Sequence, residues 1–182
     1  MMKKIKFLLP IVSMALIFFP VHSQQSKAGP IIENFGKVFN IEKPAFKLDT
    51  TLTYKAVFDI VNSPEGHTER NKSLETAARF LNMHAQSGIP KAQLKAALVV
   101  HSKASKDLLS DAAYEKRFGV KNPNGELIKA LLSADVAIIF CGQSSMARGY
   151  PKEDLIPGVQ LSLSAMTALI QLQNDNYNLI KF

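Results

Sequence analysis

Hydrophobic and polar residues are arranged in blocks along most of the chain, and the spacing changes from strand-like to helix-like and back. Residues 54–61 (YKAVFDIV) are rich in β-branched and aromatic side chains and end at a turn, which indicates a strand. Apolar residues then recur at helical spacing from about residue 68 to 86, and Ser87-Gly88 and Pro90 end that pattern. Residues 94–101 (LKAALVVH) contain a continuous apolar run, which is typical of a strand covered on both faces.

The second half of the chain continues the alternation. A helical pattern over residues 105–118 closes at Gly119, and Asn122-Pro123 has the residue types of a helix start. The same spacing predicts a helix after residue 122, a strand at 136–140, a short helix at 142–148, a loop at 150–158, a strand at 159–163, a helix capped by Ser164 that runs to 173, and a strand at 177–180. Strands separated by helices imply right-handed crossovers, so we predict an α/β domain with a mainly parallel sheet of about five strands and helices on both faces.

The first 23 residues have the layout of a secretory signal peptide. A positive start at Lys3, Lys4 and Lys6 precedes an apolar run, and Ser23 offers a small residue for cleavage. The run is shorter than the roughly 20 residues of a membrane span, and no cysteine follows it for lipid attachment. We therefore expect the protein to be exported to the periplasm and to have no membrane attachment after cleavage.

Residues 24–51 have a different character and are interpreted as an arm. Gly29-Pro30, Gly36 and Pro44 break any long regular element. The arm is nevertheless too apolar for a disordered linker, since disorder goes with low hydrophobicity. We expect it to lie on its own domain or on a neighbouring subunit, and we assign the α/β domain to residues 52–182.

Charge and cysteine usage narrow the function classes. The chain carries a net charge of +7, and loss of the three signal lysines leaves +4 with no basic cluster, so we predict no nucleic-acid partner. Its single cysteine excludes an internal disulfide, and the scattered histidines form no zinc pattern. The turn at residues 63–68 follows a strand, as phosphate-binding turns do, but it contains Glu65 and the chain has no Trp or Gly-rich nucleotide motif, so we predict no cofactor.

Candidate chemistry lies where strands end, because ligands of open α/β sheets bind at the carboxyl ends of the strands. Three places qualify: Asn62-Ser63, His101-Ser102 and the segment Cys141-Gly142-Gln143-Ser144. Cys141 is the strongest candidate, since the start of a helix favours a thiolate and Gly142 permits close approach to the backbone. Arg148 could add positive charge, and His101 could orient or deprotonate the thiol. The alternatives are that Cys141 is the last buried residue of a core strand and that His101 only caps the sheet edge.

The segment IIFCGQSSMARGY and its continuation KEDLIPGVQLSLSAMTALIQLQNDNY resemble the DsrE/DsrF-like family. The resemblance extends over YKAVFDIV, ARFLNMHA, LKAALVVH and NPNGELIKALLSADV, and therefore covers the chain from about Tyr54 to its end. It is sharpest at the strand-end Cys141 and the Arg148-Gly149 pair. The resemblance implies a flavodoxin-like three-layer fold, a homo- or hetero-oligomer and a cysteine that carries sulfur as a persulfide.

Two hypotheses follow. In the first, the protein handles sulfur outside the cytoplasm, and Cys141 accepts sulfane sulfur from a thiol-bearing donor and passes it to an acceptor. Gly142, Gln143 and Ser144 would then surround the thiol, with His101, Arg148, Asn62 and Ser63 in support. In the second, the protein is a non-catalytic oligomeric module that binds a small ligand or serves assembly, and Cys141 is structural. A homo-oligomer is expected under both hypotheses.

Overall fold

A computed structural model describes residues 25–181 of the chain, and the predicted signal peptide lies outside these residues. One sheet of five strands has the order β4-β3-β2-β1-β5, and each neighbouring pair is parallel. The strands are β1 (Tyr54–Ile60), β2 (Leu94–Val100), β3 (Ala137–Cys141), β4 (Gln160–Ser162) and β5 (Asn178–Ile180). The predicted parallel α/β sheet is therefore confirmed.

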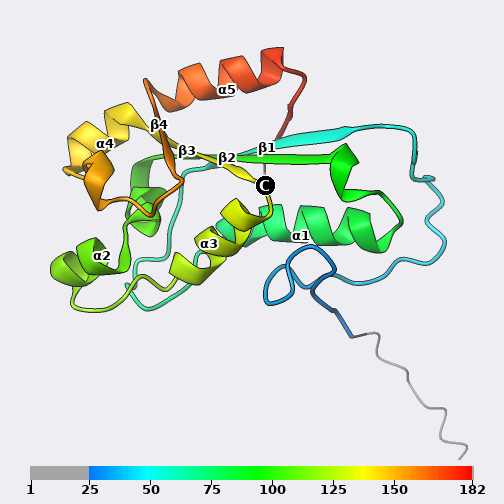
Figure 1. Ribbon diagram of the computed structural model, residues 1–182, viewed down its shortest axis with the longest axis horizontal. Coiled ribbons are helices and arrows are strands. Elements are labelled where there is room, and N and C mark those ends of the chain that lie inside the picture. Colours follow the sequence, from blue (N-terminus) through cyan, green and yellow to red (C-terminus); the bar gives the residue numbers. More distant parts are fainter. Residues whose placement is uncertain (1–24, 182) are drawn as a thin grey trace, which may run out of the picture.

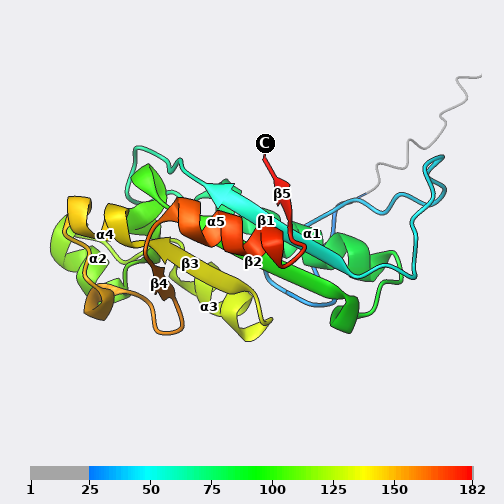
Figure 2. The same ribbon diagram turned by 90° about the horizontal axis from the view of Figure 1, so that it is seen from above.

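Helices cover both faces of this sheet. They are α1 (Lys72–Gln86), α2 (Asp111–Phe118), α3 (Gly125–Ser133), α4 (Gly142–Arg148) and α5 (Ala165–Asn174), with short 3₁₀ helices η1 (Lys91–Gln93), η2 (Ser102–Leu108) and η3 (Lys152–Asp154). Figure 1 shows α1 and α3 beneath the sheet, α5 above it, and α4 beyond the end of β3. Figure 2 shows α5 lying along the middle strands, with β5 beside β1. Within residues 25–181, no helix has the length and apolar character needed to cross a membrane.

The strands divide their side chains between two apolar clusters, because successive residues of a strand point to opposite faces. Phe58, Leu98 and Phe140 belong to the larger cluster under α1 and α3. Val57, Val99 and Cys141 belong to the smaller cluster, which Ala165 and Ala168 of α5 complete. The candidate cysteine therefore faces α5, and so do the strand residues that share its alternation.

The predicted helix over residues 105–118 is wrong as one element, since the structure has η2 and α2 there. The residues between them are extended and pair with the segment before β4: Leu109 bridges Leu155, and the Ser110 N–H donates to the Asp154 carbonyl at 2.8 Å. The Ser110 hydroxyl then accepts from the Ala113 N–H at 3.2 Å and starts α2. A tertiary pairing thus interrupts a pattern that looks continuous in sequence.

Two predicted helix starts are also displaced. α1 begins at Lys72 and not near residue 68, because Asn71 is its N-cap and accepts from the Ser73 N–H at 3.0 Å. α3 begins at Gly125, so Asn122 is not its cap. The Asn122 amide instead donates to the carbonyls of Asp107 and Leu109 at 2.8 and 2.7 Å. Asn122 therefore ties two loops together.

The arm packs on its own domain over much of its length. The side chain of Asn82, fully buried on α1, accepts from the N–H groups of Ile31 and Ile32 at 3.2 and 2.9 Å. It also donates to the carbonyls of Ile32, Phe35 and Gly36. Gly36 has φ of +72°, and a Cβ there would lie 2.5 Å from the backbone of Ala78. The close approach explains why this position is glycine.

Candidate functional site

Cys141 lies where β3 ends and α4 begins. It is the last residue of β3, pairs in register with Ser162 of β4, and occupies the N-cap position of α4. Only 5% of the residue is exposed, and it packs in the apolar cluster beneath α5. The predicted strand-to-helix junction is confirmed, and the thiol is nearly enclosed.

Gly142 is required by the chain's own packing. A Cβ at this position would lie 2.5 Å from the Ser162 carbonyl oxygen and 3.1 Å from that of Leu163. The turn between β4 and α5 therefore presses directly on the start of α4. We predicted that Gly142 leaves room for another molecule, but in the structure this room is occupied by the chain's own backbone.

The surroundings of the sulfur favour its ionised form. Burial raises the pKa of the Cys141 thiol, but the backbone N–H groups of Ser144, Ala165 and Gln143 and the Ser144 hydroxyl oppose it and hold the pKa below its ordinary value. The sulfur makes no capping hydrogen bond to α4, so these donors act together as nearby partial positive charges. Two come from the backbone of α4 and one from the start of α5, so the ends of two helices converge on the thiol.

His101 lies level with Cys141 on the neighbouring strand. β2 and β3 pair up to Val100 and Phe140, and continuing this register by one residue sets His101 beside Cys141 on the face under α5. The imidazole is nevertheless engaged elsewhere: Nε2 donates to the Asp59 carboxylate at 2.9 Å, and Nδ1 pairs with the Ser102 hydroxyl at 3.0 Å. None of the hydrogen bonds of the described residues joins His101 to Cys141. The sequence predicted that His101 and Cys141 would lie at the same edge of the sheet, but it did not predict the hydrogen-bond partners of the imidazole.

Ser102, at the predicted place after β2, connects this imidazole to the start of α4. It has φ of +54°, and its N–H donates to the Ser144 hydroxyl oxygen at 3.1 Å. Sequence reasoning missed Asp59, which is the last residue but one of β1 and pairs in register with Val99 on the α5 face. Its sequence signal was a single carboxylate in the apolar run of residues 56–61. Hydrogen bonds therefore link four residues in series, Asp59, His101, Ser102 and Ser144, and Ser144 is also a donor to the Cys141 sulfur.

Gln143 and Arg148 lie at the outer side of α4. Gln143 is exposed, and its amide donates to the Leu163 carbonyl at 3.3 Å, which links α4 to the turn before α5. Arg148 is the last residue of α4 and is exposed, and no hydrogen bond or ion pair within residues 25–181 involves its side chain. The suggested folding of Arg148 back over the thiol is therefore not seen.

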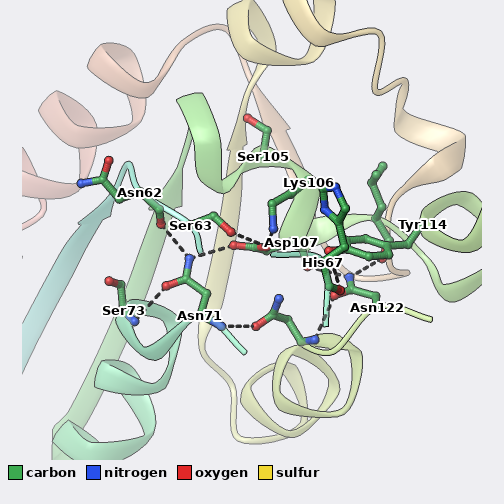
Figure 3. A network of polar contacts seen from close by, with 12 residues as sticks. Asn62, Ser63, His67, Asn71, Ser73, Ser105, Lys106, Asp107, Tyr114 and Asn122 are labelled. Carbon is green, nitrogen blue, oxygen red and sulfur yellow. Dashed lines mark hydrogen bonds and ion pairs between the residues drawn. The ribbon is translucent and has the colours of Figure 1, made fainter. Parts of the chain in front are cut away.

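Asn62 and Ser63 belong to a separate polar network (Figure 3). Its centre is Asp107, which is fully buried and accepts from the Ser63 hydroxyl at 2.9 Å and the Asn71 amide at 2.7 Å. Asn71 also donates to the Asn62 carbonyl at 2.7 Å. Burial raises the pKa of Asp107, against the opposing effect of its donors Asn71, Lys106 and Ser63. This network joins the loops after β1 and β2, and it does not include Cys141.

An apolar rim lies next to the candidate site. We use this name for four exposed residues from α4, the turn after β4 and α5: Met146, Leu163, Met166 and Ile170. Leu163 and Met166 are 73% and 72% exposed, and Leu163 is in the segment that presses on Gly142. Large apolar side chains grouped at a surface mark interaction sites. No group of three or more His, Cys, Asp or Glu side chains within the described residues could hold a metal ion.

The chain belongs to the DsrE/DsrF-like family, whose sequence model matches residues 55–182. This range begins in β1 and includes the strand end at Cys141, so the family resemblance inferred from the motifs is confirmed. Among curated proteins none matches the chain significantly.

Two solved structures share the fold. A protein of unknown function, MTH1491 from Methanobacterium thermoautotrophicum, is 19% identical with a TM-score of 0.54, and the match covers 71% of this chain and 99% of that one. The ychN protein from E. coli is 21% identical with a TM-score of 0.51 over the same shares of the two chains. These similarities place the chain in a flavodoxin-like α/β fold.

Proposed function

We propose that this DsrE-like protein is an exported sulfur carrier that holds sulfane sulfur on Cys141 as a persulfide. The observation that carries the proposal is the set of N–H and hydroxyl donors around the sulfur, which lowers the pKa of the thiol despite its burial. Thiol exchange proceeds through the thiolate, so a thiol that ionises more readily is better prepared for it.

The proposed transfer is balanced in sulfur and charge. The Cys141 thiolate attacks the outer sulfur of a persulfide or polysulfide donor. A new S–S bond forms at Cys141, the donor's own S–S bond breaks, and the donor leaves as a thiolate with the electron pair. An acceptor thiolate then attacks the outer sulfur of the Cys141 persulfide and releases the Cys141 thiolate. No external oxidant or reductant is consumed.

The rim supports an encounter with another protein. Transfer to a partner's thiol requires the partner's surface to cover the site, and the exposed apolar residues of α4, of α5 and of the turn between β4 and α5 suit such a contact. We propose that the same rim also supports a homo-oligomer. We include export in the proposal only because residues 1–23 have the sequence layout of a secretory signal peptide.

The burial of Cys141 favours a second function. With 5% of the residue exposed and its side chain in the cluster under α5, Cys141 can equally serve as core packing. The protein would then be a non-catalytic oligomeric module. The two functions differ in whether the folded protein admits a sulfur donor to the thiol.

Intact mass of the purified protein distinguishes the two functions. The protein is incubated with polysulfide in its folded state, with Cys141→Ser and the exposed control Ser133→Ala alongside. Since the chain has a single cysteine, a carrier gains sulfur that reductant removes, and only the Cys141→Ser variant fails to gain it. An unchanged mass for folded protein, with labelling only after denaturation, would contradict the carrier and support the structural role.

A further inference from the structure

A groove of about 780 Å³ lies on the opposite edge of the domain from Cys141. It runs between α1 and the edge of the sheet formed by β1 and β5, which Figure 2 shows side by side. Leu52, Phe58, Met83 and Ile180 contribute to its apolar lining. Its volume falls in the range of roughly 300–1,000 Å³ that is usual for small-molecule sites. Cys141, His101 and the apolar rim do not line it.

One wall of the groove is built from a row of rings that contact one another at tilted or edge-on angles. The ring centres of Tyr54 and His84 are 4.9 Å apart, those of His84 and Phe80 are 4.5 Å apart, and those of Phe80 and Phe58 are 6.0 Å apart. The His84 ring is also held by a hydrogen bond between Nδ1 and the Phe80 carbonyl oxygen at 2.8 Å. Because these rings support one another, the wall exists before any ligand arrives.

The charged residues of the groove all have one sign. Lys55, Lys72 and Arg79 line it, and no Asp or Glu does. Lys55 is already paired with Asp175 at 3.0 Å. Lys72 and Arg79 are exposed, and no ion pair within residues 25–181 includes either. They lie seven residues apart on α1, which is two helical turns, so they share the face that also presents Thr76 to the groove.

We propose that this groove binds a small anionic amphiphile, such as a single-chain carboxylic acid. The apolar body of the ligand lies against the ring wall, and its carboxylate is held by Arg79 and Lys72 at the mouth. Arginine and carboxylate match in geometry as well as charge. An apolar groove in which Lys72 and Arg79 have no ion-pair partner within residues 25–181 selects against neutral and cationic amphiphiles, because only an anionic head compensates these two charges.

Dodecanoate is the test ligand, titrated calorimetrically into the purified protein, with dodecyltrimethylammonium as the cation of equal chain length. We expect saturable binding of dodecanoate only, weaker at high salt. Replacing both cations, with Lys72→Gln and Arg79→Gln together, should weaken binding at least about tenfold, as expected from loss of charged hydrogen bonds. The control Lys116→Gln removes an exposed charge of α2 outside the groove and should leave binding unchanged.

Four results would overturn the proposal. Equal binding of dodecanoate and its cationic counterpart would show unselective apolar adsorption. Binding that survives in the double variant would show that the two cations do not hold the head group. A third result is a wild type that self-associates but binds no dodecanoate. If Met83→Glu then abolishes this self-association, a second copy of the chain occupies the groove. Binding to anionic phospholipid vesicles without binding of free dodecanoate would assign the basic groove to a membrane surface.

Discussion

Cys141 experiences two opposing influences on its acidity. Burial under α5 raises the pKa of the thiol, and the donors at the starts of α4 and α5 lower it by a larger total amount. The Ser144 hydroxyl takes part in two contacts. It lowers the pKa of the thiol, and it accepts a hydrogen bond from the Ser102 N–H, which connects α4 to the end of β2. The acidity of the thiol therefore depends on contacts between three separate segments.

Ser144→Ala removes one donor and should raise the pKa of Cys141 toward the ordinary thiol value of about 8.5. Iodoacetamide labelling of the folded protein at pH 7 should become several-fold slower, and its pH midpoint should move upward. Ser133→Ala is the control and should match the wild type. An identical midpoint in Ser144→Ala and wild type would contradict the role of the hydroxyl.

The same lowered pKa couples stability to pH. Because the thiol has a lower pKa in the folded state than in the unfolded chain, its ionisation adds stability that is complete above the unfolded pKa and is lost as pH falls through the folded one. Compared with Cys141→Ser, the wild type should gain unfolding free energy as pH rises through this window. Urea unfolding at several pH values measures the difference, and parallel curves for the two proteins would contradict it.

Gly142→Ala should destabilise the protein by about 1–3 kcal/mol, because the new Cβ would lie 2.5 Å from the Ser162 carbonyl oxygen and would force the β4–α5 turn outward. The change should also separate the Ala165 N–H from the sulfur and raise the pKa of Cys141. The control is Gly66→Ala, whose Cβ would meet only the flexible side chain of Glu69. Equal urea midpoints for the two variants would contradict the steric reason.

At the scale of elements, single buried amides attach whole segments to the sheet layers. Asn71 caps α1 and bonds to Asp107 and the Asn62 carbonyl, while Asn122 joins the segment after α2 to the end of η2. Asn82 attaches the arm to α1: its side-chain oxygen accepts from the Ile32 N–H, and its side-chain nitrogen donates to the Ile32 carbonyl. Each of these side chains is 6% exposed or less, so it has little water to replace a lost partner.

Asn82→Ala should therefore release the arm. It leaves several buried backbone groups without a partner, at a cost of about 2–4 kcal/mol. Thermal unfolding should report the loss, and trypsin should cut faster at Lys37 in otherwise folded protein. Gln173→Ala, which removes an exposed amide bonded only within α5, is the control. An arm that stays resistant to trypsin in Asn82→Ala would contradict this attachment.

At the scale of the whole molecule, the two faces of the sheet are covered unequally. α1, α3 and the arm lie on one face, whereas α5 is the one long helix on the other (Figure 1). The exposed apolar residues of the rim lie on α4, on α5 and in the turn before α5. Because Cys141 lies on the α5 side of the sheet, assembly through the rim would alter access to the thiol.

Leu163→Asp together with Met166→Asp should prevent this assembly. Charges within an apolar contact lose their hydration without gaining partners, so we expect the oligomer to dissociate while the fold persists. Sedimentation of the purified protein measures the change. Phe46→Asp alters a still more exposed apolar residue in the arm and should leave the mass as in wild type. A wild type that is already monomeric would contradict the proposed homo-oligomer.

Local patterns in the sequence were sufficient for the strands, for most of the helices and for the position of the cysteine. The apolar run before Cys141 predicts a strand that ends there, and Ser164 caps α5 as its sequence context indicates, with a 3.0 Å bond from the Thr167 N–H. These features depend on spacing and on hydrogen bonds between residues close in the chain, and such information is present in a short window of sequence.

Tertiary structure alone decided which residues meet at the site. The order β4-β3-β2-β1-β5 brings the β4–α5 turn onto Gly142 and the Ala165 N–H toward the sulfur, and no local pattern contains that order. The pairing of β1 with β2 likewise sets Asp59 beside the His101 ring, and the Asp107 network draws Ser63 away from the thiol. Contacts between distant segments depend on the packing of whole layers, so a sequence can place a cysteine at a strand end without revealing the donors that tune it.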